Sequence, residues 1–169
     1  MSLLFRAGRL AVLIPFALAP ALAAARDFKA GDLVVQQPWA RATPGGAEVA
    51  GGYLTVVNHG ASADTLTGGS IAAAARFEIH DMSVENGIMR MRPAGPLAIP
   101  PGGSVTLSPS GTHIMFTGLK RGLKKGETID GTLTFAHAGT VPVQFEVEGI
   151  GAKKPSAGAG QPMPGMNMD

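Results

Sequence analysis

The chain has 169 residues, a formal net charge of +2 and no cysteine. This length suits a single domain, and the absence of cysteine excludes disulfides and thiolate metal sites. The short basic runs Lys120-Arg121 and Lys124-Lys125 fall short of the clustered positive charge that a nucleic-acid surface needs. No nucleic-acid partner is therefore expected.

Residues 1–25 have the pattern of a secretory signal peptide. Arg6 and Arg9 supply the positive start, residues 10–18 are apolar, and residues 21–25 provide small side chains for cleavage. The apolar stretch is short for a spanning helix, although a retained N-terminal anchor stays open as an alternative. Removing the two arginines from the 14 Lys and Arg leaves 12, beside 12 Asp and Glu, so we expect an exported, nearly neutral mature chain without a membrane span.

Residues 26–150 predict one all-β domain. Short runs rich in β-branched and aromatic residues alternate with turn signals such as Thr43-Pro44-Gly45-Gly46 and Glu85-Asn86-Gly87, and no segment has a sustained helical period. Strands of this length and spacing suggest an antiparallel sandwich or barrel. We predict strands at residues 33–36, 39–42, 52–58, 64–67, 76–82, 88–92, 105–107, 113–117, 128–136 and 141–147.

The last two predicted strands alternate most regularly. Leu133 and Phe135 share one face of the first, and Val143, Phe145 and Val147 share one face of the second. The intervening residues of the second strand are polar: Gln144, Glu146 and Glu148. This pattern predicts a hairpin with one face in the core.

Two histidines and two methionines follow a distinctive spacing in the middle of the chain. Ten residues separate His80 from Met91, 21 separate Met91 from His113, and one separates His113 from Met115. Imidazole and thioether donors suit Cu(I). Zinc prefers imidazole, thiolate and carboxylate and seldom binds thioether, calcium and magnesium prefer oxygen ligands, and a blue-copper centre needs a cysteine. The pattern predicts one Cu(I) ion bound by these four side chains.

Strand geometry separates the histidines from the core. Alternation places His113 and Met115 on one face of their strand, with Ile114 and Phe116 on the other. The same alternation separates His80 from its apolar neighbours. The phase of the strands therefore supports the two histidines and Met115 as ligands.

The segment around Met91 leaves two interpretations open. Met89 and Met91 alternate with arginines, so a plain strand that buries both methionines fits as well as a metal ligand does. Met82 and Met89 are interpreted either as neighbours that assist copper capture or as packing residues. His59 and His137 lie at turns and are predicted to be surface residues.

Several segments resemble the PCuAC family of periplasmic copper chaperones, over about residues 32–147. They are Trp39-Ala40-Arg41-Ala42-Thr43-Pro44, Ala50-Gly51-Gly52-Tyr53-Leu54, Glu78-Ile79-His80-Asp81-Met82, Asn86-Gly87-Ile88-Met89-Arg90-Met91-Arg92, Pro100-Pro101-Gly102-Gly103, Thr112-His113-Ile114-Met115 and Gly118-Leu119-Lys120. The resemblance implies a cupredoxin-like antiparallel β-sandwich in the periplasm, with Cu(I) bound by His80, Met91, His113 and Met115. It also implies delivery to the dinuclear copper centre of cytochrome c oxidase subunit II, alongside a Sco-type thiol protein.

Residues 151–169 are expected to form a disordered C-terminal tail. Gly, Ala, Pro, Lys and Ser dominate, and no β-branched or aromatic residue follows Ile150, so little apolar surface is available to offset the entropy of ordering. The tail contains Met163, Met166 and Met168 but no histidine. Weak additional Cu(I) binding and a plain solvated terminus are both open there.

The predicted function is that of a monomeric copper carrier without catalytic turnover. It passes Cu(I) to a copper-accepting periplasmic protein by ligand exchange. Three alternatives remain: a periplasmic copper buffer or resistance protein, an enzyme that uses copper for oxidation, and an interaction module whose methionines pack the core. No paired carboxylates, nucleophile motif or phosphate loop encourages an enzyme.

Overall fold

The computed structural model describes residues 27–156; the predicted signal peptide and the methionines of the tail lie outside this range. The described chain is built from strands alone, and it contains no helix that could cross a membrane. The strands are β1 (Asp27–Ala30), β2 (Leu33–Arg41), β3 (Val49–Asn58), β4 (Asp64–Ile71), β5 (Ala74–Glu85), β6 (Ile88–Pro93), β7 (Leu97–Ile99), β8 (Ser104–Leu107), β9 (His113–Leu119), β10 (Thr128–Phe135) and β11 (Gly139–Glu148). The all-β prediction is confirmed.

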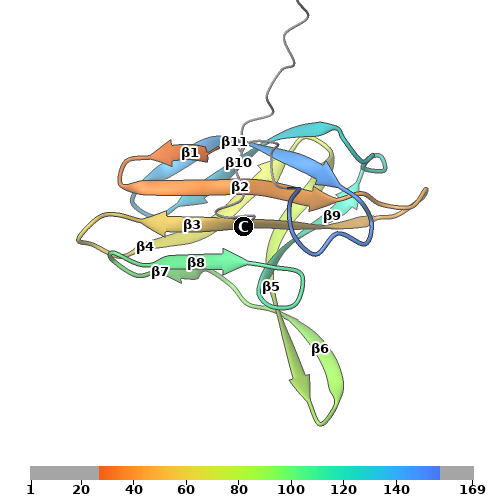
Figure 1. Ribbon diagram of the computed structural model, residues 1–169, viewed down its shortest axis with the longest axis horizontal. Coiled ribbons are helices and arrows are strands. Elements are labelled where there is room, and N and C mark those ends of the chain that lie inside the picture. Colours follow the sequence, from red (N-terminus) through yellow and green to blue (C-terminus); the bar gives the residue numbers. More distant parts are fainter. Residues whose placement is uncertain (1–26, 157–169) are drawn as a thin grey trace, which may run out of the picture.

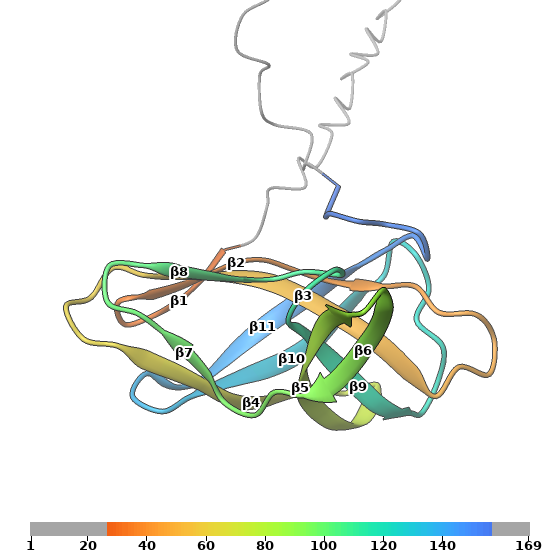
Figure 2. The same ribbon diagram turned by 90° about the horizontal axis from the view of Figure 1, so that it is seen from below.

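The strands form two layers around an apolar core (Figure 2). Their hydrogen-bonded order is β6-β5-β9-β3-β2-β11-β10-β4-β7, with β1 added to β2 and β8 added to β3. Every pair is antiparallel except β2 with β11. The first part of β3 pairs with β9 and its second part with β8, so β3 connects the strands of the two layers.

Aromatic rings from three strands hold the layers together. Phe116 on β9 packs edge-on against Phe145 on β11 at 5.4 Å between centroids, and Phe77 on β5 meets Phe116 at 5.8 Å. Phe116 and Phe145 are fully buried, and β10 and β11 form the predicted hairpin with their alternate apolar residues inside. Gly52 on β3 makes room for this cluster, because a Cβ there would lie 2.5 Å from the Phe116 ring.

Strand β2 differs from its prediction. The sequence predicts two strands, at 33–36 and 39–42, whereas the structure has one strand with a register shift between Gln36 and Trp39. Gln37 adopts φ 46°, and Pro38 has no N–H to donate, so the irregularity falls at these two residues. The short strands β1 and β7 were not predicted.

Residues 151–156, at the start of the predicted tail, contact the sandwich through hydrogen bonds. Ala152 accepts a hydrogen bond from Arg41 Nε at 2.7 Å, and Ser156 donates its N–H and its hydroxyl to the two Glu148 carboxylate oxygens at 2.7 and 2.8 Å. Glu148 is consequently only 8% exposed, although strand alternation places it on the polar face of β11. We call residues 151–156 the C-terminal strap.

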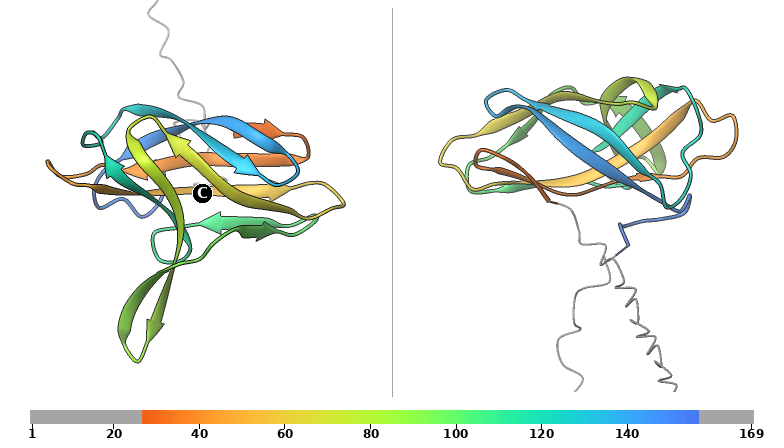
Figure 3. Two further views of the ribbon diagram at one scale, coloured as in Figure 1. Left: turned by 180° about the vertical axis from the view of Figure 1, so that it is seen from behind. Right: turned by 90° about the horizontal axis from the view of Figure 1, so that it is seen from above.

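The hairpin of β5 and β6 stands away from the sandwich (Figures 1 and 3). Every residue of β6 is exposed, and β6 lies at one end of the strand order. Most of the large apolar side chains that the described chain exposes belong to this hairpin: Val84, Ile88, Met89 and Met91. The interpretation that Met89 and Met91 pack into the core is therefore wrong.

Candidate metal centre

The two predicted histidine ligands face each other across neighbouring strands. His80 on β5 and His113 on β9 are direct partners in the antiparallel ladder, and their ring centroids lie 6.2 Å apart. His113 is 3% exposed and the His80 side chain 15%. Core residues on the opposite face of β9, Ile114 and Phe116, are fully buried, which confirms the predicted phase of this strand.

The two predicted methionine ligands reach the same end of the molecule from different strands. Met115 on β9 lies opposite Glu78 on β5 and Gly51 on β3. Met91 on β6 lies opposite Met82 on β5. Met115 shares β9 with His113, and the β5–β6 hairpin brings Met91 to the pocket that His113 lines.

An open pocket of about 230 Å³ joins three of the four predicted ligands, namely Met91, His113 and Met115. Met82 also lines the pocket, together with Arg41, Val49, Ala50, Gly51, Tyr53 and Pro109. His80 is not among the lining residues and lies beside the pocket, across the ladder from His113. The structure therefore brings His113, Met91 and Met115 to one pocket. His80 lies on the neighbouring strand, opposite His113.

The hydrogen bonds of the two histidines differ. His113 Nδ1 lies 2.9 Å from the Gly111 carbonyl oxygen, whereas His80 Nε2 lies 2.8 Å from Glu78 Oε2. The other His80 nitrogen, Nδ1, is buried and has no hydrogen-bond partner. Within residues 27–156, it is the one buried side-chain nitrogen or oxygen atom that lacks a hydrogen-bond partner.

Glu78 has a well-defined environment beside His80. Its hydrogen bond with His80 lowers the pKa of the Glu78 carboxyl; burial acts in the opposite sense, and the positive charge of Arg76 adds to the lowering. Thr117 Oγ1 lies 3.5 Å and Arg76 Nε 3.6 Å from Glu78 Oε1. The carboxylate is thus held in its ionised form between β5 and β9.

Tyr53 lines the pocket and packs against Trp39 behind it. Tyr53 lies 4.4 Å from Trp39 and 6.3 Å from His113 between ring centroids, and the Arg41 guanidinium carbon lies 5.7 Å from the Tyr53 centroid. Burial raises the pKa of the Tyr53 hydroxyl, and the Arg41 charge partly offsets this effect. Gly51 leaves room for that hydroxyl, since a Cβ there would clash with it.

Sequence reasoning missed Arg41, Tyr53 and Glu78 as residues of this region. No spacing rule points to Arg41 or Tyr53. Glu78 does precede His80 by two residues, so strand alternation puts both on one face, which was an available signal. Of the two uncertain methionines, Met82 lines the pocket, whereas Met89 does not and is 67% exposed.

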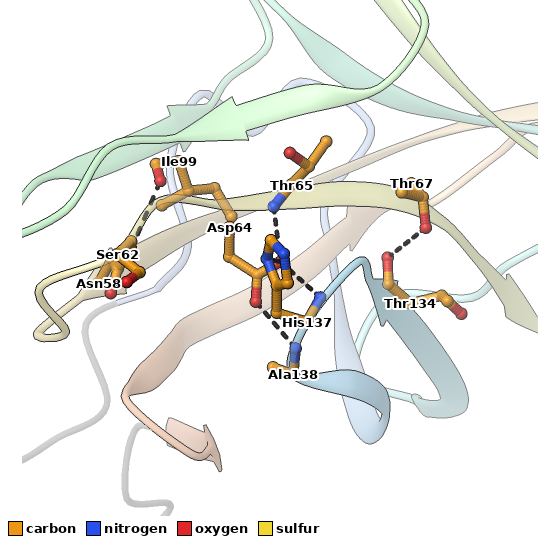
Figure 4. A network of polar contacts seen from close by, with 9 residues as sticks. All are labelled: Asn58, Ser62, Asp64, Thr65, Thr67, Ile99, Thr134, His137 and Ala138. Carbon is orange, nitrogen blue, oxygen red and sulfur yellow. Dashed lines mark hydrogen bonds and ion pairs between the residues drawn. The ribbon is translucent and has the colours of Figure 1, made fainter.

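The turn residue His137 belongs to a separate polar network around Asp64 (Figure 4). The Asp64 carboxylate accepts hydrogen bonds from the backbone N–H groups of Thr65, His137 and Ala138 at 2.7–2.9 Å. Burial raises the pKa of Asp64, but these three bonds outweigh it and the pKa is lowered. The imidazole of His137 is 77% exposed, and His59 is exposed, as predicted for surface residues.

The fold and this arrangement of histidines and methionines define the class of the protein: a PCuAC-type domain, with a cupredoxin-like β-sandwich. The copper-bound PCuAC domain from PmoF2 is 26% identical to it, covers 73% of this chain and 98% of that domain, and superposes with a TM-score of 0.64. DR1885 from Deinococcus radiodurans matches in its apo form (28% identity, 91% and 99% coverage, TM-score 0.56) and in its Cu(I) form (29%, 76% and 83%, 0.53).

The chain belongs to the LpqE-like family, whose model is described as "Putative lipoprotein LpqE-like" and matches residues 33–147. A relative from Leifsonia xyli subsp. xyli (strain CTCB07), named "Putative lipoprotein Lxx21020", is 33% identical over 130 residues. That match spans 76% of this chain and 77% of the relative. The expected resemblance to the PCuAC family is confirmed.

Proposed function

We propose that this protein is a periplasmic copper chaperone that binds one Cu(I) through His80, Met91, His113 and Met115 and releases it by ligand exchange. One observation carries the proposal: two strands, β6 and β9, bring Met91, His113 and Met115 to one pocket, and His80 on β5 lies directly opposite His113. Two imidazoles and two thioethers form a soft donor set that favours Cu(I) over zinc or calcium.

The relatives support this function. The PmoF2 domain was solved with copper bound, and DR1885 was solved in a Cu(I) form. Both resemble this chain over most of its described fold. In the proposed function copper is cargo that the protein carries, so no catalytic step is assigned to it.

The unequal exposure of the proposed ligands suits stepwise transfer. Met91 is 46% exposed on the projecting hairpin, whereas His113 is 3% exposed in the wall of the sandwich. An incoming ligand can therefore replace Met91 first, while the buried histidine holds the ion until the acceptor has gained a second bond. Each exchange keeps the number of copper bonds nearly constant, which avoids releasing a free ion.

The proposed cellular setting is the periplasm. The family is described as lipoprotein-like, which suggests export, and residues 1–25 have the composition of a signal peptide. We propose a copper-accepting protein of that compartment as the partner: a Sco-type protein or cytochrome c oxidase subunit II, as the PCuAC resemblance implies. The carrier is proposed to act as a monomer.

An anaerobic Cu(I) titration of the mature protein, in competition with a chromogenic chelator, tests the proposal. We expect one ion per domain, with tight binding lost in the double variant His113→Ala, Met115→Leu. His137→Ala serves as the matched control, since it removes an exposed imidazole outside the pocket. An unchanged isotherm in the double variant would reject the ligand assignment.

A copper buffer or resistance protein is the alternative function, because the same site could sequester copper without a dedicated recipient. Deleting a delivery protein lowers cytochrome oxidase activity when copper is scarce. Deleting a buffer increases sensitivity to excess copper and leaves oxidase activity intact. Measuring both phenotypes in one deletion strain, complemented with wild type or with the double variant, separates the two functions.

A further inference from the structure

We infer that Glu78 is a positioning residue for copper: it keeps the proton of His80 on Nε2, so that His80 offers Nδ1 to the ion while His113 offers Nε2. This inference rests on the proposed copper-binding function and adds to it. Neutral imidazole carries one N–H donor and one lone pair, and only the nitrogen with the lone pair can bind a metal. The partner of one nitrogen therefore decides which nitrogen is left for copper.

The hydrogen bond of His113 fixes its tautomer. A backbone carbonyl can only accept, so the contact of Nδ1 with the Gly111 oxygen at 2.9 Å requires the proton on Nδ1. Gly111 is itself anchored, because its N–H donates to Ser108 and because Ser108 N–H donates to Thr112. The loop before β9 thus leaves His113 Nε2 as the metal-binding atom.

The hydrogen bond of His80 leads to the opposite tautomer. A carboxylate oxygen has no hydrogen to donate, so the 2.8 Å contact between Glu78 Oε2 and His80 Nε2 places the proton on His80 Nε2. Nδ1 then carries the lone pair. This atom is buried without a partner, a condition that costs free energy and that bound Cu(I) would relieve.

Glu78 is placed to perform this role with little freedom. Thr117 and Arg76 approach its other oxygen, Oε1, which leaves Oε2 for His80. In the β5–β9 ladder Glu78 lies opposite Met115, and His80 lies opposite His113, so the carboxylate is built into the same two strands as three proposed ligands. Carboxylates and backbone carbonyls that accept the second N–H of a ligating histidine orient the ring and maintain metal affinity.

Histidine tautomers in the metal-free protein provide the first test. Long-range proton–nitrogen correlation spectra of ¹⁵N-histidine-labelled protein at pH 8 should show Nε2–H for His80 and Nδ1–H for His113. One equivalent of Cu(I), which is diamagnetic, should then shift His80 Nδ1 and His113 Nε2. A His80 ring with its proton on Nδ1, or copper bound to His80 Nε2, would overturn the inference.

Variants of Glu78 provide the second test. Glu78→Ala should give mixed His80 tautomers and weaken Cu(I) binding about 10- to 100-fold. Glu78→Gln keeps a carbonyl acceptor and should restore most of the affinity. Glu85→Ala, which removes a carboxylate that pairs with hairpin arginines, is the matched control and should bind as wild type.

The two tests separate this inference from the proposed function. If wild type binds no Cu(I), both the function and the inference fail. If wild type binds Cu(I) but Glu78→Ala binds equally well with an unaltered His80 tautomer, the positioning role fails and the carrier function stands. The tautomer spectrum of wild type decides the matter even if Glu78→Ala does not fold.

Discussion

Met91 and Met82 are direct partners in the β5–β6 ladder, and both line the pocket that contains His113, whereas Met89, two residues earlier on β6, does not. Strand β6 therefore carries two exposed methionines, Met91 inside the pocket lining and Met89 outside it. Comparing variants of the two separates the effect of pocket position on copper binding from the effect of losing a methionine.

Met91→Leu should weaken Cu(I) binding at least about tenfold, because it replaces a thioether donor with an alkyl group of similar size. Met89→Leu should leave binding unchanged. Both side chains are exposed, so the free energy of unfolding should change by less than about 0.5 kcal/mol in either variant. Chelator competition and urea unfolding measure the two quantities, and equal copper affinities in the two variants would remove Met91 from the site.

Copper should stabilise the native protein through mass action. A ligand that binds only the folded state at about 100 times its Kd adds about 2.7 kcal/mol to the free energy of unfolding. Removing copper with a chelator should reverse this gain. The double variant His113→Ala, Met115→Leu should show no copper-dependent shift of Tm; a shift equal to that of wild type would point to copper bound elsewhere.

Gly52→Ala should destabilise the sandwich by about 1–3 kcal/mol, because the new Cβ would approach to 2.5 Å of the buried Phe116 ring. Gly68→Ala on β4 is the control, since its Cβ would meet no atom within 4 Å. The control should change the free energy of unfolding by less than about 0.5 kcal/mol. Equal stabilities in urea would contradict the close packing of β3 on the aromatic cluster.

Stability should fall in acid partly through Asp64. Its pKa is lowered in the folded state, so its ionised form stabilises the fold above the unfolded pKa of about 3.9, and this contribution is lost as the pH falls through the folded value. Asp64→Asn should lower the free energy of unfolding by about 1–3 kcal/mol at pH 7, because three backbone N–H groups lose their carboxylate acceptor. The variant should also show a weaker dependence of stability on acid pH. Urea unfolding from pH 7 to pH 3 measures both effects.

The same variant should keep its copper affinity where it is folded, because Asp64 is not among the residues that line the metal pocket. A parallel loss of copper binding in folded Asp64→Asn would show that the two regions are coupled. An acid dependence identical to that of wild type would instead show that other carboxylates account for it.

Ser156→Ala should destabilise the protein by about 1 kcal/mol. The change removes the hydroxyl that donates to Glu148 Oε2 at 2.8 Å and leaves a largely buried carboxylate oxygen without that partner. Thr106→Ala, which loses a hydroxyl contact with Thr55 in an exposed position, is the matched control. Equal loss in both variants would mean that the strap adds no specific stability.

Local patterns in the sequence were enough to predict an all-β domain and most of its strands. Period-two alternation correctly assigned Ile114, Phe116 and Phe145 to the core, because each strand has only two faces and apolar side chains occupy the inner one. The spacing of histidines and methionines likewise predicted a set of candidate copper ligands, since donor chemistry depends on residue type.

Tertiary structure alone decided how these residues meet. The pairing of β5 with β9 places His80 opposite His113, and the hairpin returns Met91 toward the same end, because hydrogen-bond register joins residues that are far apart in sequence. It also supplied Tyr53 and Arg41 beside the ligands, the strap over Glu148, and the unpartnered Nδ1 of His80. Such contacts depend on the packing of separate strands, and no local pattern encodes them.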